Sequence, residues 1–201
     1  METRADITLR DARAEDEDAF FEFLLASTPE WEALLGEDTR DVVSHVYRKR
    51  GNLFSFQHVR VAEIHEQTAG MVLGYDWRFK QEQTLTTGIL LLGHIRVKHL
   101  GMVPAFLSGS TKVGQVNKGE FFISNIAARP EFHGKGVGRA LLDDTVQRAR
   151  AHGAEAIALE VKESNKRAVR FYEKHGFEID SEISLNVNGP EYLFRMIKDI
   201  V

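Results

Sequence analysis

Apolar and polar residues alternate over two stretches in the first part of the chain, and both stretches predict β-structure. Residues 6–12 predict an opening strand. Residues 53–66 and 69–79 predict two neighbouring antiparallel strands, with Gln67–Ala69 in the turn between them. Alternation of this kind places one side of a strand against a core and the other side in water. These stretches therefore predict part of one sheet.

Apolar residues at helical spacing fill the region between these strands. Residues 14–28 combine an acidic first turn with one apolar face and predict a helix. The helical pattern continues over residues 29–36 and 39–50, with a break at Gly36. The stretch 80–118 also has helical spacing, but glycines and a proline interrupt it. It predicts short helices and loops that shape the wall of a pocket.

The second half of the chain alternates strands with helices. The predicted strands are residues 120–128, 154–161, 177–187 and 191–200, and the predicted helices are residues 137–152 and 164–176. Pro130 ends the first of these strands, and Gly153 and Gly176 end the two helices. The last two strands form a closing hairpin around Asn188–Pro190. Strands and helices in this order predict an α/β fold.

Composition excludes several classes of protein. The 201 residues contain no cysteine, which excludes disulfides, thiolate nucleophiles and cysteine metal sites. The formal net charge of −4 argues against broad nucleic-acid binding. The charged N-terminus is not a secretory signal, and the longest apolar run, residues 88–93, is too short to cross a membrane. We therefore expect a soluble cytoplasmic protein that acts neither on nucleic acid nor in a membrane.

Three glycines at alternate positions, Gly134, Gly136 and Gly138, lie between a predicted strand and a predicted helix. A helix N-terminus has free N–H groups and partial positive charge, and glycine lets a phosphate approach the backbone. Lys135 and Arg139 add positive charge at the same end. The spacing does not match the Walker or the dinucleotide pattern. Glycine spacing alone leaves two interpretations open, a phosphate-binding turn or a flexible turn without a ligand.

The segments NIAARPEFHGKGVGRALL and ALEVKESNKRAVRFYEKHGF resemble the GNAT superfamily of acetyl-CoA-dependent N-acetyltransferases. His133, Gly136 and Gly138 occupy the positions of its Gln/Arg-x-x-Gly-x-Gly/Ala motif, with histidine in place of Gln or Arg. The resemblance implies one α/β domain over residues 1–201, with a mixed, mostly antiparallel sheet splayed at its fourth and fifth strands and helices on both faces. It also makes the stretch of about residues 80–118 a helical insertion before the fourth strand.

The same resemblance implies which residues contact the coenzyme. The glycine turn would hold the pyrophosphate, and the backbone of Ile126–Ala128 would bind the pantetheine arm and polarise the thioester carbonyl. Asn165 resembles the family's cofactor-contacting asparagine. The implied coenzyme site is Ile126, Ala127, Ala128, His133, Gly134, Lys135, Gly136, Val137, Gly138, Arg139 and Asn165.

Two residues are candidates for proton transfer. Tyr172 resembles the family's general acid, and a tyrosine with a pKa of about 10 carries its proton at neutral pH. Its place on an apolar stripe also fits a simple core residue. Glu160 lies late in a predicted apolar strand, where related enzymes that acetylate N-termini have a glutamate as general base. The alternative for Glu160 is a cross-strand or surface carboxylate.

The sequence thus predicts direct transfer of an acetyl group from acetyl-CoA to a primary amine of a small molecule or peptide, without a metal. The alternative is an acyl-CoA-binding sensor or interaction module without turnover. His94 and His99 are candidates for lining the acceptor pocket, and Glu30, Glu32, Glu37, Asp38 and Asp41 for attracting a cationic amine. The strand edge at residues 191–197 would allow a homodimer through strand pairing.

Overall fold

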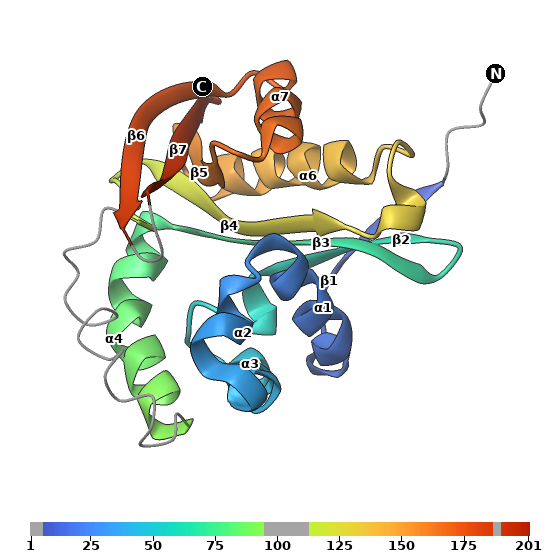
Figure 1. Cartoon of the computed structure of the whole chain (residues 1–201). Coiled ribbons are helices and arrows are strands. Elements are labelled where there is room, and N and C mark those ends of the chain that lie inside the picture. Colours follow the sequence, from blue (N-terminus) through green and yellow to red (C-terminus); the bar gives the residue numbers. More distant parts are fainter. Residues whose placement is uncertain (1–5, 95–112, 187–189) are drawn as a thin grey trace.

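A seven-stranded sheet with helices on both faces organises the computed structural model, which describes residues 6–94, 113–186 and 190–201 (Figure 1). The strands are β1 (Ile7–Asp11), β2 (Val59–Ile64), β3 (Gln67–Asp76), β4 (Glu120–Ala128), β5 (Ala156–Lys162), β6 (Glu178–Asn186) and β7 (Pro190–Asp199). Their spatial order is β1-β2-β3-β4-β5-β7-β6. Only β4 and β5 pair in parallel, so the predicted mixed, mostly antiparallel sheet is confirmed.

The helices form one layer on each face of the sheet. α6 (Val137–Ala151) and α7 (Lys166–Lys174) cover one face, and α1 (Glu17–Ser27), α2 (Glu30–Leu35), α3 (Thr39–Arg48) and α4 (Trp77–His94) lie on the other (Figure 1). Short 3-10 helices occupy Ala14–Asp16, Gly36–Asp38, Phe56–His58 and Pro130–Phe132. Among the helices of the described residues, none is long and apolar enough to cross a membrane.

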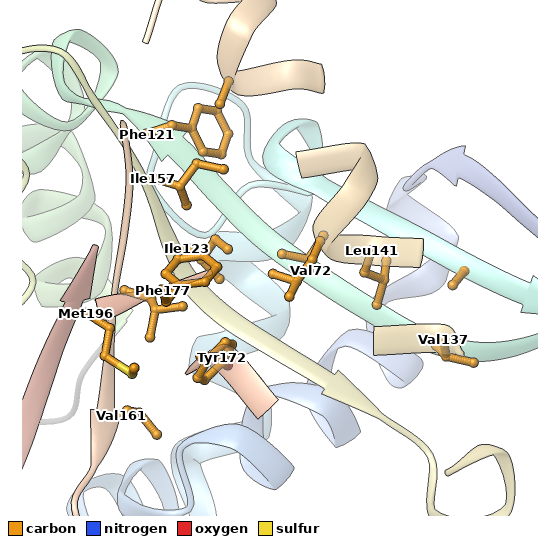
Figure 2. Packing of buried hydrophobic residues seen from close by; sticks show 14 of the residues in the cluster. Val72, Phe121, Ile123, Val137, Leu141, Ile157, Val161, Tyr172, Phe177 and Met196 are labelled. Carbon is orange, nitrogen blue, oxygen red and sulfur yellow. The ribbon is translucent and has the colours of Figure 1, made fainter. Parts of the chain in front are cut away.

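Each helical layer encloses its own hydrophobic core. Val72, Ile123, Leu141 and Ile157 belong to the core under α6 and α7 (Figure 2). The core under α1–α3 contains a second set, which includes Phe20, Leu24, Val43, Tyr47 and Leu73. Burying a side chain of this size stabilises the fold by about 1.5–3 kcal/mol. The sheet is therefore held rigidly from both sides, which fixes the positions of residues on its central strands.

A β-bulge interrupts the middle of β4. Leu73 of β3 pairs with Asn125, whereas the next residue of β3 pairs with Ile123, so Ser124 has no partner of its own on β3. The extra residue shifts the alternation of the strand. Ile123 before the bulge and Ile126 after it both face the α6–α7 core, although they are three residues apart. The bulge thus changes which residues of β4 face each layer.

Two expected boundaries in the β2–β3 hairpin are wrong. The turn lies at His65 and Glu66, with φ of 50° and 63°, and not at Gln67–Ala69, which are part of β3. Both turn residues adopt the left-handed conformation that a tight two-residue hairpin requires. The first strand also begins only at Val59, because Ser55 accepts a hydrogen bond from the backbone N–H of Gln57 and caps a 3-10 helix.

The stretch after β3 is a single long helix and not the expected end of a strand followed by short helices. The Asp76 carboxylate accepts a hydrogen bond from the backbone N–H of Phe79 at 2.9 Å, which caps α4. Gly88 and Gly93 lie inside this helix, and Gly88 is buried. Residues 95–112 of the predicted insertion lie outside the described residues.

The expected free strand edge at residues 191–197 is also wrong. β7 lies between β5 and β6 and pairs with both along its length, so the edges of the sheet are β1 and β6. A row of unpaired backbone groups is needed for strand pairing between subunits. β7 therefore offers no edge to a second subunit.

Candidate active site

Helix α6 begins at a turn in which no side chain of the described residues caps the first helical amides. Gly136, the N-cap residue, has a φ of 91°, in the left-handed region that favours glycine. The first N–H groups of a helix lack acceptors within the helix, and the helix dipole adds partial positive charge. Lys135 and Arg139 are exposed at the same end. Phosphate groups bind proteins at turns of this kind.

Gly138 is required by packing between two helices. A Cβ atom at this position would lie 3.1 Å from the ring of Phe171 on α7, which is tighter than an ordinary contact. The absence of a side chain lets α6 and α7 approach each other closely. Because Phe171 precedes Tyr172, this contact fixes the start of α6 relative to the candidate acid.

His133 closes the turn between β4 and α6. Its Nε2 atom lies 3.0 Å from the backbone oxygen of Ala128. A carbonyl oxygen only accepts hydrogen bonds, so Nε2 carries the proton and donates it. Histidine in place of the usual Gln or Arg thus supplies an N–H donor that holds the turn against the end of β4.

The two central strands β4 and β5 diverge after four paired residues. Glu120–Ile123 pairs in parallel with Ala156–Leu159, and beyond this point the two strands no longer pair with each other. β4 extends to Ala128 and β5 to Lys162. The predicted splay between the fourth and fifth strands is therefore confirmed, and it opens a gap next to the start of α6.

Backbone amides of β4 point into this gap. The N–H of Arg129 donates to the oxygen of Ala69 on β3 at 2.9 Å. Successive N–H groups of a strand point to opposite edges, so those of Ile126 and Ala128 point away from β3 and toward the gap. The N–H of Ala127 points toward β3. The gap therefore receives two amide donors from one side.

Tyr172 lies on α7 beneath the point of divergence. Its side chain packs against Phe171 and Phe177, and Figure 2 shows Tyr172 and Phe177 among the residues of the α6–α7 core. The residue is only 8% exposed. No described residue forms a hydrogen bond with its hydroxyl. Burial raises the pKa of Tyr172 above its usual value, so the hydroxyl keeps its proton at neutral pH. The residue is thus both a core residue and a potential proton donor.

Asn165 caps the same helix. Its side-chain oxygen accepts a hydrogen bond from the backbone N–H of Ala168 at 3.1 Å. The residue is exposed at the N-terminus of α7. Its structural role is therefore to begin the helix that carries Tyr172, and its side-chain NH₂ group is not used in this cap.

Glu160 lies on β5 and faces the helical layer opposite to Tyr172. Its carboxylate oxygens accept hydrogen bonds from the backbone N–H of Gly114 at 2.8 and 3.0 Å. Burial raises the pKa of Glu160, and the Gly114 N–H and the charges of Arg195 and Lys80 oppose this shift without cancelling it. A carboxylate with a raised pKa accepts a proton more readily at neutral pH than an exposed one does.

Lys80 lies near Glu160, and the sequence pattern did not indicate this. It lies in the first turn of α4, with its Nζ atom 5.9 Å from the centre of the Tyr75 ring. A Cβ atom on Gly114 would lie 3.8 Å from the same Nζ atom. A single lysine after an aromatic stretch carries no sequence signal, because its neighbours come from β3 and from the segment before β4.

Lys162 connects three elements on the Glu160 side of the sheet. Its Nζ atom forms ion pairs with Glu30 of α2 and with Glu191 of β7, the latter at 2.8 Å. Nearby, the side chain of Asn125 donates to the hydroxyls of Ser27 and Thr28 at 2.9 and 2.8 Å. These contacts fix the end of α1 and the start of α2 beside the diverging strands.

His94, one of the two candidate acceptor histidines, is not brought to this site. His94 is the last residue of α4 and stacks on His45 of α3, with ring centres 3.8 Å apart. His99 lies outside the described residues. Among the acidic residues of the first helices, Glu30 reaches the site through Lys162. The described part of the chain contains no group of three or more acidic or histidine side chains that could hold a metal ion.

Comparison with proteins of known sequence gives local matches to acetyltransferases. The mycothiol acetyltransferase of Propionibacterium freudenreichii is 45% identical over 64 residues, which are 32% of this chain and 20% of that protein. The ribosomal protein bS18-alanine N-acetyltransferase of Escherichia coli K12 is 37% identical over 65 residues, which are 32% of this chain and 44% of that protein. The match therefore spans less than half the length of either relative.

Solved structures match over nearly the whole chain. An N-acetyltransferase from Staphylococcus aureus Mu50 superimposes with a TM-score of 0.72 at 20% identity and covers 94% of this chain and 99% of its own. The E. coli bS18-alanine enzyme gives a TM-score of 0.57 at 17% identity and covers 96% and 94%. At such low identity these likenesses show the fold.

A model of the acetyltransferase (GNAT) family matches residues 18–177, a range that includes the glycine turn, the diverging strands and Tyr172. This range is most of the chain. The chain therefore belongs to the GNAT acetyltransferase family.

Proposed function

We propose that this protein is an N-acetyltransferase that moves an acetyl group from acetyl-CoA to a primary amine. The observation that carries the proposal is the divergence of β4 and β5 directly beside the uncapped N-terminus of α6. An elongated ligand with a phosphate group at one end and a hydrogen-bonding chain at the other fits this arrangement. Acetyl-CoA has that chemistry and, when bound, supplies the acetyl thioester.

The residues present fit this ligand at both ends. At the phosphate end, Gly134–Arg139 offers free amides and two cations, and His133 holds the turn in place. In the gap, the amides of Ile126 and Ala128 are oriented to bind the pantetheine arm and the thioester oxygen. Each preorganised donor of this kind lowers a reaction barrier by about 3 kcal/mol. Asn165, with its free NH₂ group, is the proposed contact from the start of α7.

Two side chains move the protons that the reaction requires. The attacking amine loses a proton, and we assign its removal to Glu160, whose pKa is raised by burial. The leaving thiolate gains a proton, and we assign its donation to Tyr172. The two residues face opposite sides of the sheet at the splay, so each is placed to act on a different side of the thioester.

The acceptor is a primary amine of a small molecule or of a peptide. The names of the two matching relatives differ in exactly this respect, because one refers to mycothiol and the other to an alanine of a ribosomal protein. Their similarity covers about a third of this chain, so it supports the reaction class and leaves both acceptor classes in place. The acceptor side is bounded by α2, β5 and β7.

Coenzyme binding is tested by placing a carboxylate at the start of α6. Gly136→Glu is expected to weaken binding of coenzyme A by at least about tenfold, because like charges repel at the phosphate position. The measurement is a calorimetric titration with coenzyme A and acetyl-CoA. Gly153→Glu is the matched control, since Gly153 also has a positive φ, of 72°, but lies at the other end of α6.

Both variants are expected to lose stability through backbone strain, by about 1–2 kcal/mol. Only Gly136→Glu should lose binding. Equal binding by the two variants, or failure of the folded wild type to bind either ligand, would show that the turn does not hold the coenzyme.

The role of Glu160 is tested by removing its charge. Glu160→Gln is expected to lower kcat by at least about tenfold, because the amide cannot accept the proton of the amine. As the wild type is acidified, its rate should fall as Glu160 becomes protonated, at a pH above the ordinary value of 4.5, since its pKa is raised. The measurement is the pH dependence of kcat with a fixed amine.

Glu163→Gln is the control for this change, because Glu163 lies only three residues further on and pairs with Lys166 on the surface. It should keep both kcat and the pH profile of the wild type. A Glu160→Gln enzyme with an unchanged acidic limb would assign that limb to another group.

A further inference from the structure

The ammonium group of Lys80 is half-buried and lacks a counter-charge in direct contact. Within residues 6–94, 113–186 and 190–201, no hydrogen bond or ion pair joins its Nζ atom to another residue, and its contact there is the distant face of the Tyr75 ring. Burial lowers its pKa, and the attraction of Glu160 does not compensate for this. Burying an unpaired charge destabilises a folded protein unless something else offsets it.

Glu160 does not fill this role, although it is near. Both of its oxygens accept from the N–H of Gly114, and a Cβ atom on Gly114 would lie 3.8 Å from the Nζ atom of Lys80. Gly114 has a φ of 70°, a conformation that side chains rarely adopt. A carboxylate and an ammonium group are thus held close to each other and kept apart by one residue.

Two other cations near Glu160 are already paired. Lys162 binds Glu30 and Glu191, and Arg195 binds Glu120 at 2.5 Å. Lys80 differs from both because it forms no ion pair with an acidic side chain of the described residues. The paired cations have structural roles, whereas the charge of Lys80 remains available to a ligand.

The Tyr75 ring that Lys80 faces belongs to a small hydrophobic cluster. Tyr75 and Phe122 are buried in this cluster, with Phe79 and Val116 packed against them. An apolar wall excludes water and strengthens the attraction between opposite charges. A ligand lying along this wall would meet Glu160 and Lys80 as its two charged contacts.

We propose that Lys80 binds an anionic group of the acceptor, a carboxylate or a phosphate, while the acceptor's amine lies at Glu160. The acceptor would then carry opposite charges that complement the two side chains. This inference rests on the proposed function, because it takes Glu160 as the place of the reacting amine. It assigns to the first turn of α4 a part in selecting the substrate.

The test compares pairs of amines that differ only in charge. One arm compares free amino acids with their carboxamides. The same arm compares dipeptides that have an acidic side chain with dipeptides that have the corresponding amide side chain. The other arm offers aminoalkyl phosphates and the corresponding amino alcohols. The wild type is expected to prefer the anionic member by about tenfold or more in kcat/KM, the effect of one charge-assisted hydrogen bond. The arm with the larger ratio of kcat/KM between anionic and uncharged members shows whether the preferred anionic group is a carboxylate or a phosphate.

The variants are Lys80→Met, which removes the charge and keeps the aliphatic stem, and Lys80→Arg, which restores the charge. Lys80→Met should lose the preference through a higher KM for the anionic members, with the uncharged members unchanged. Lys80→Arg should recover part of it. Lys174→Met, on the exposed last turn of α7, is the matched control and should keep the full preference.

Two results would overturn the inference while the proposed function stands. One is turnover of uncharged amines without any preference for anionic ones, and the other is an equal loss for both classes in Lys80→Met. Calorimetric titration of the same amines into the protein loaded with coenzyme A supplies a readout that does not need turnover. Anionic amines that bind to the wild type, bind more weakly to Lys80→Met and are never acetylated would uphold the anion site and refute the transferase.

Discussion

Replacing Tyr172 with phenylalanine is expected to lower kcat by about a hundredfold or more, with binding of acetyl-CoA unchanged. General acids contribute about 10²–10⁴ to a rate, and phenylalanine removes the only proton that this side chain donates. The change keeps the ring that packs against Phe171 and Phe177. No hydrogen bond to a described residue is lost, so the fold should remain intact. The measurements are steady-state release of coenzyme A thiol with an amine, and calorimetric binding of acetyl-CoA.

Tyr47→Phe is the matched control, since Tyr47 is also buried but lies in the core under α1–α3. Its hydroxyl donates to the oxygen of Arg13 at 3.0 Å, so the variant should lose about 1 kcal/mol of stability and keep its kcat. Unchanged turnover in Tyr172→Phe would mean that the thiolate takes its proton from another group. Binding of acetyl-CoA by the wild type without turnover of any amine would favour an acyl-CoA sensor.

Replacing Arg195 with methionine is expected to destabilise the protein by about 3–5 kcal/mol, because it leaves the charge of Glu120 buried without its partner. The two side chains are each 7% exposed, and the guanidinium nitrogen lies 2.5 Å from the carboxylate. Arg195 also donates to the backbone oxygen of Gln115 at 2.8 Å. The loss would appear as a lower midpoint in chemical denaturation, with the slope of the transition retained.

Two further variants separate the buried charge from a general effect of losing an arginine. Arg40→Met removes an exposed ion pair with Asp18 and should cost less than about 1 kcal/mol. Combining Arg195→Met with Glu120→Leu should recover part of the stability, because neither charge is then left alone. A single Arg195→Met variant as stable as Arg40→Met would show that the pair is not buried in solution.

The same pair predicts how the fold responds to acid. Burial alone would raise the pKa of Glu120, but hydrogen bonds from Arg195 and Asn117 outweigh it, and the pKa lies below the usual 4.5. A carboxyl whose pKa is lowered by folding stabilises the protein above its unfolded pKa. The contribution of Glu120 should therefore be lost only as the pH falls below 4.5.

The second half of the fold could be predicted from the sequence because each element carries its own local signal. β4 and β5 are short apolar runs, and both following helices end at glycines. The uncapped start of α6 follows from the positions of Gly136 and Gly138, although the packing of Gly138 against Phe171 does not. The sequence was sufficient to predict those elements whose start and end are determined by residues close to them in the chain.

The features that could not be predicted depend on contacts between distant segments. The aromatic residues after β3 continue the alternation of a strand, and only the cap formed by Asp76 turns them into a helix. The two left-handed residues of the β2–β3 turn, His65 and Glu66, are not residues that favour this conformation. Lys80, Gly114 and Glu160 come from three separate segments, and no residue spacing in the sequence indicates that they lie close together.

The bulge at Ser124 gives the gene for this protein one place in β4 where a codon can be lost. Ile123 pairs with Gly74 of β3, Asn125 with Leu73 and Ile126 with Val72, so only Ser124 lies outside the regular register. Deleting its codon would therefore leave every other residue of β4 opposite its present partner and facing its present helical layer. Deleting a codon elsewhere in the strand would instead turn the residues on one side of the deletion to the opposite face. Relatives of this protein should therefore differ in the length of β4 at the bulge before they differ in its length anywhere else.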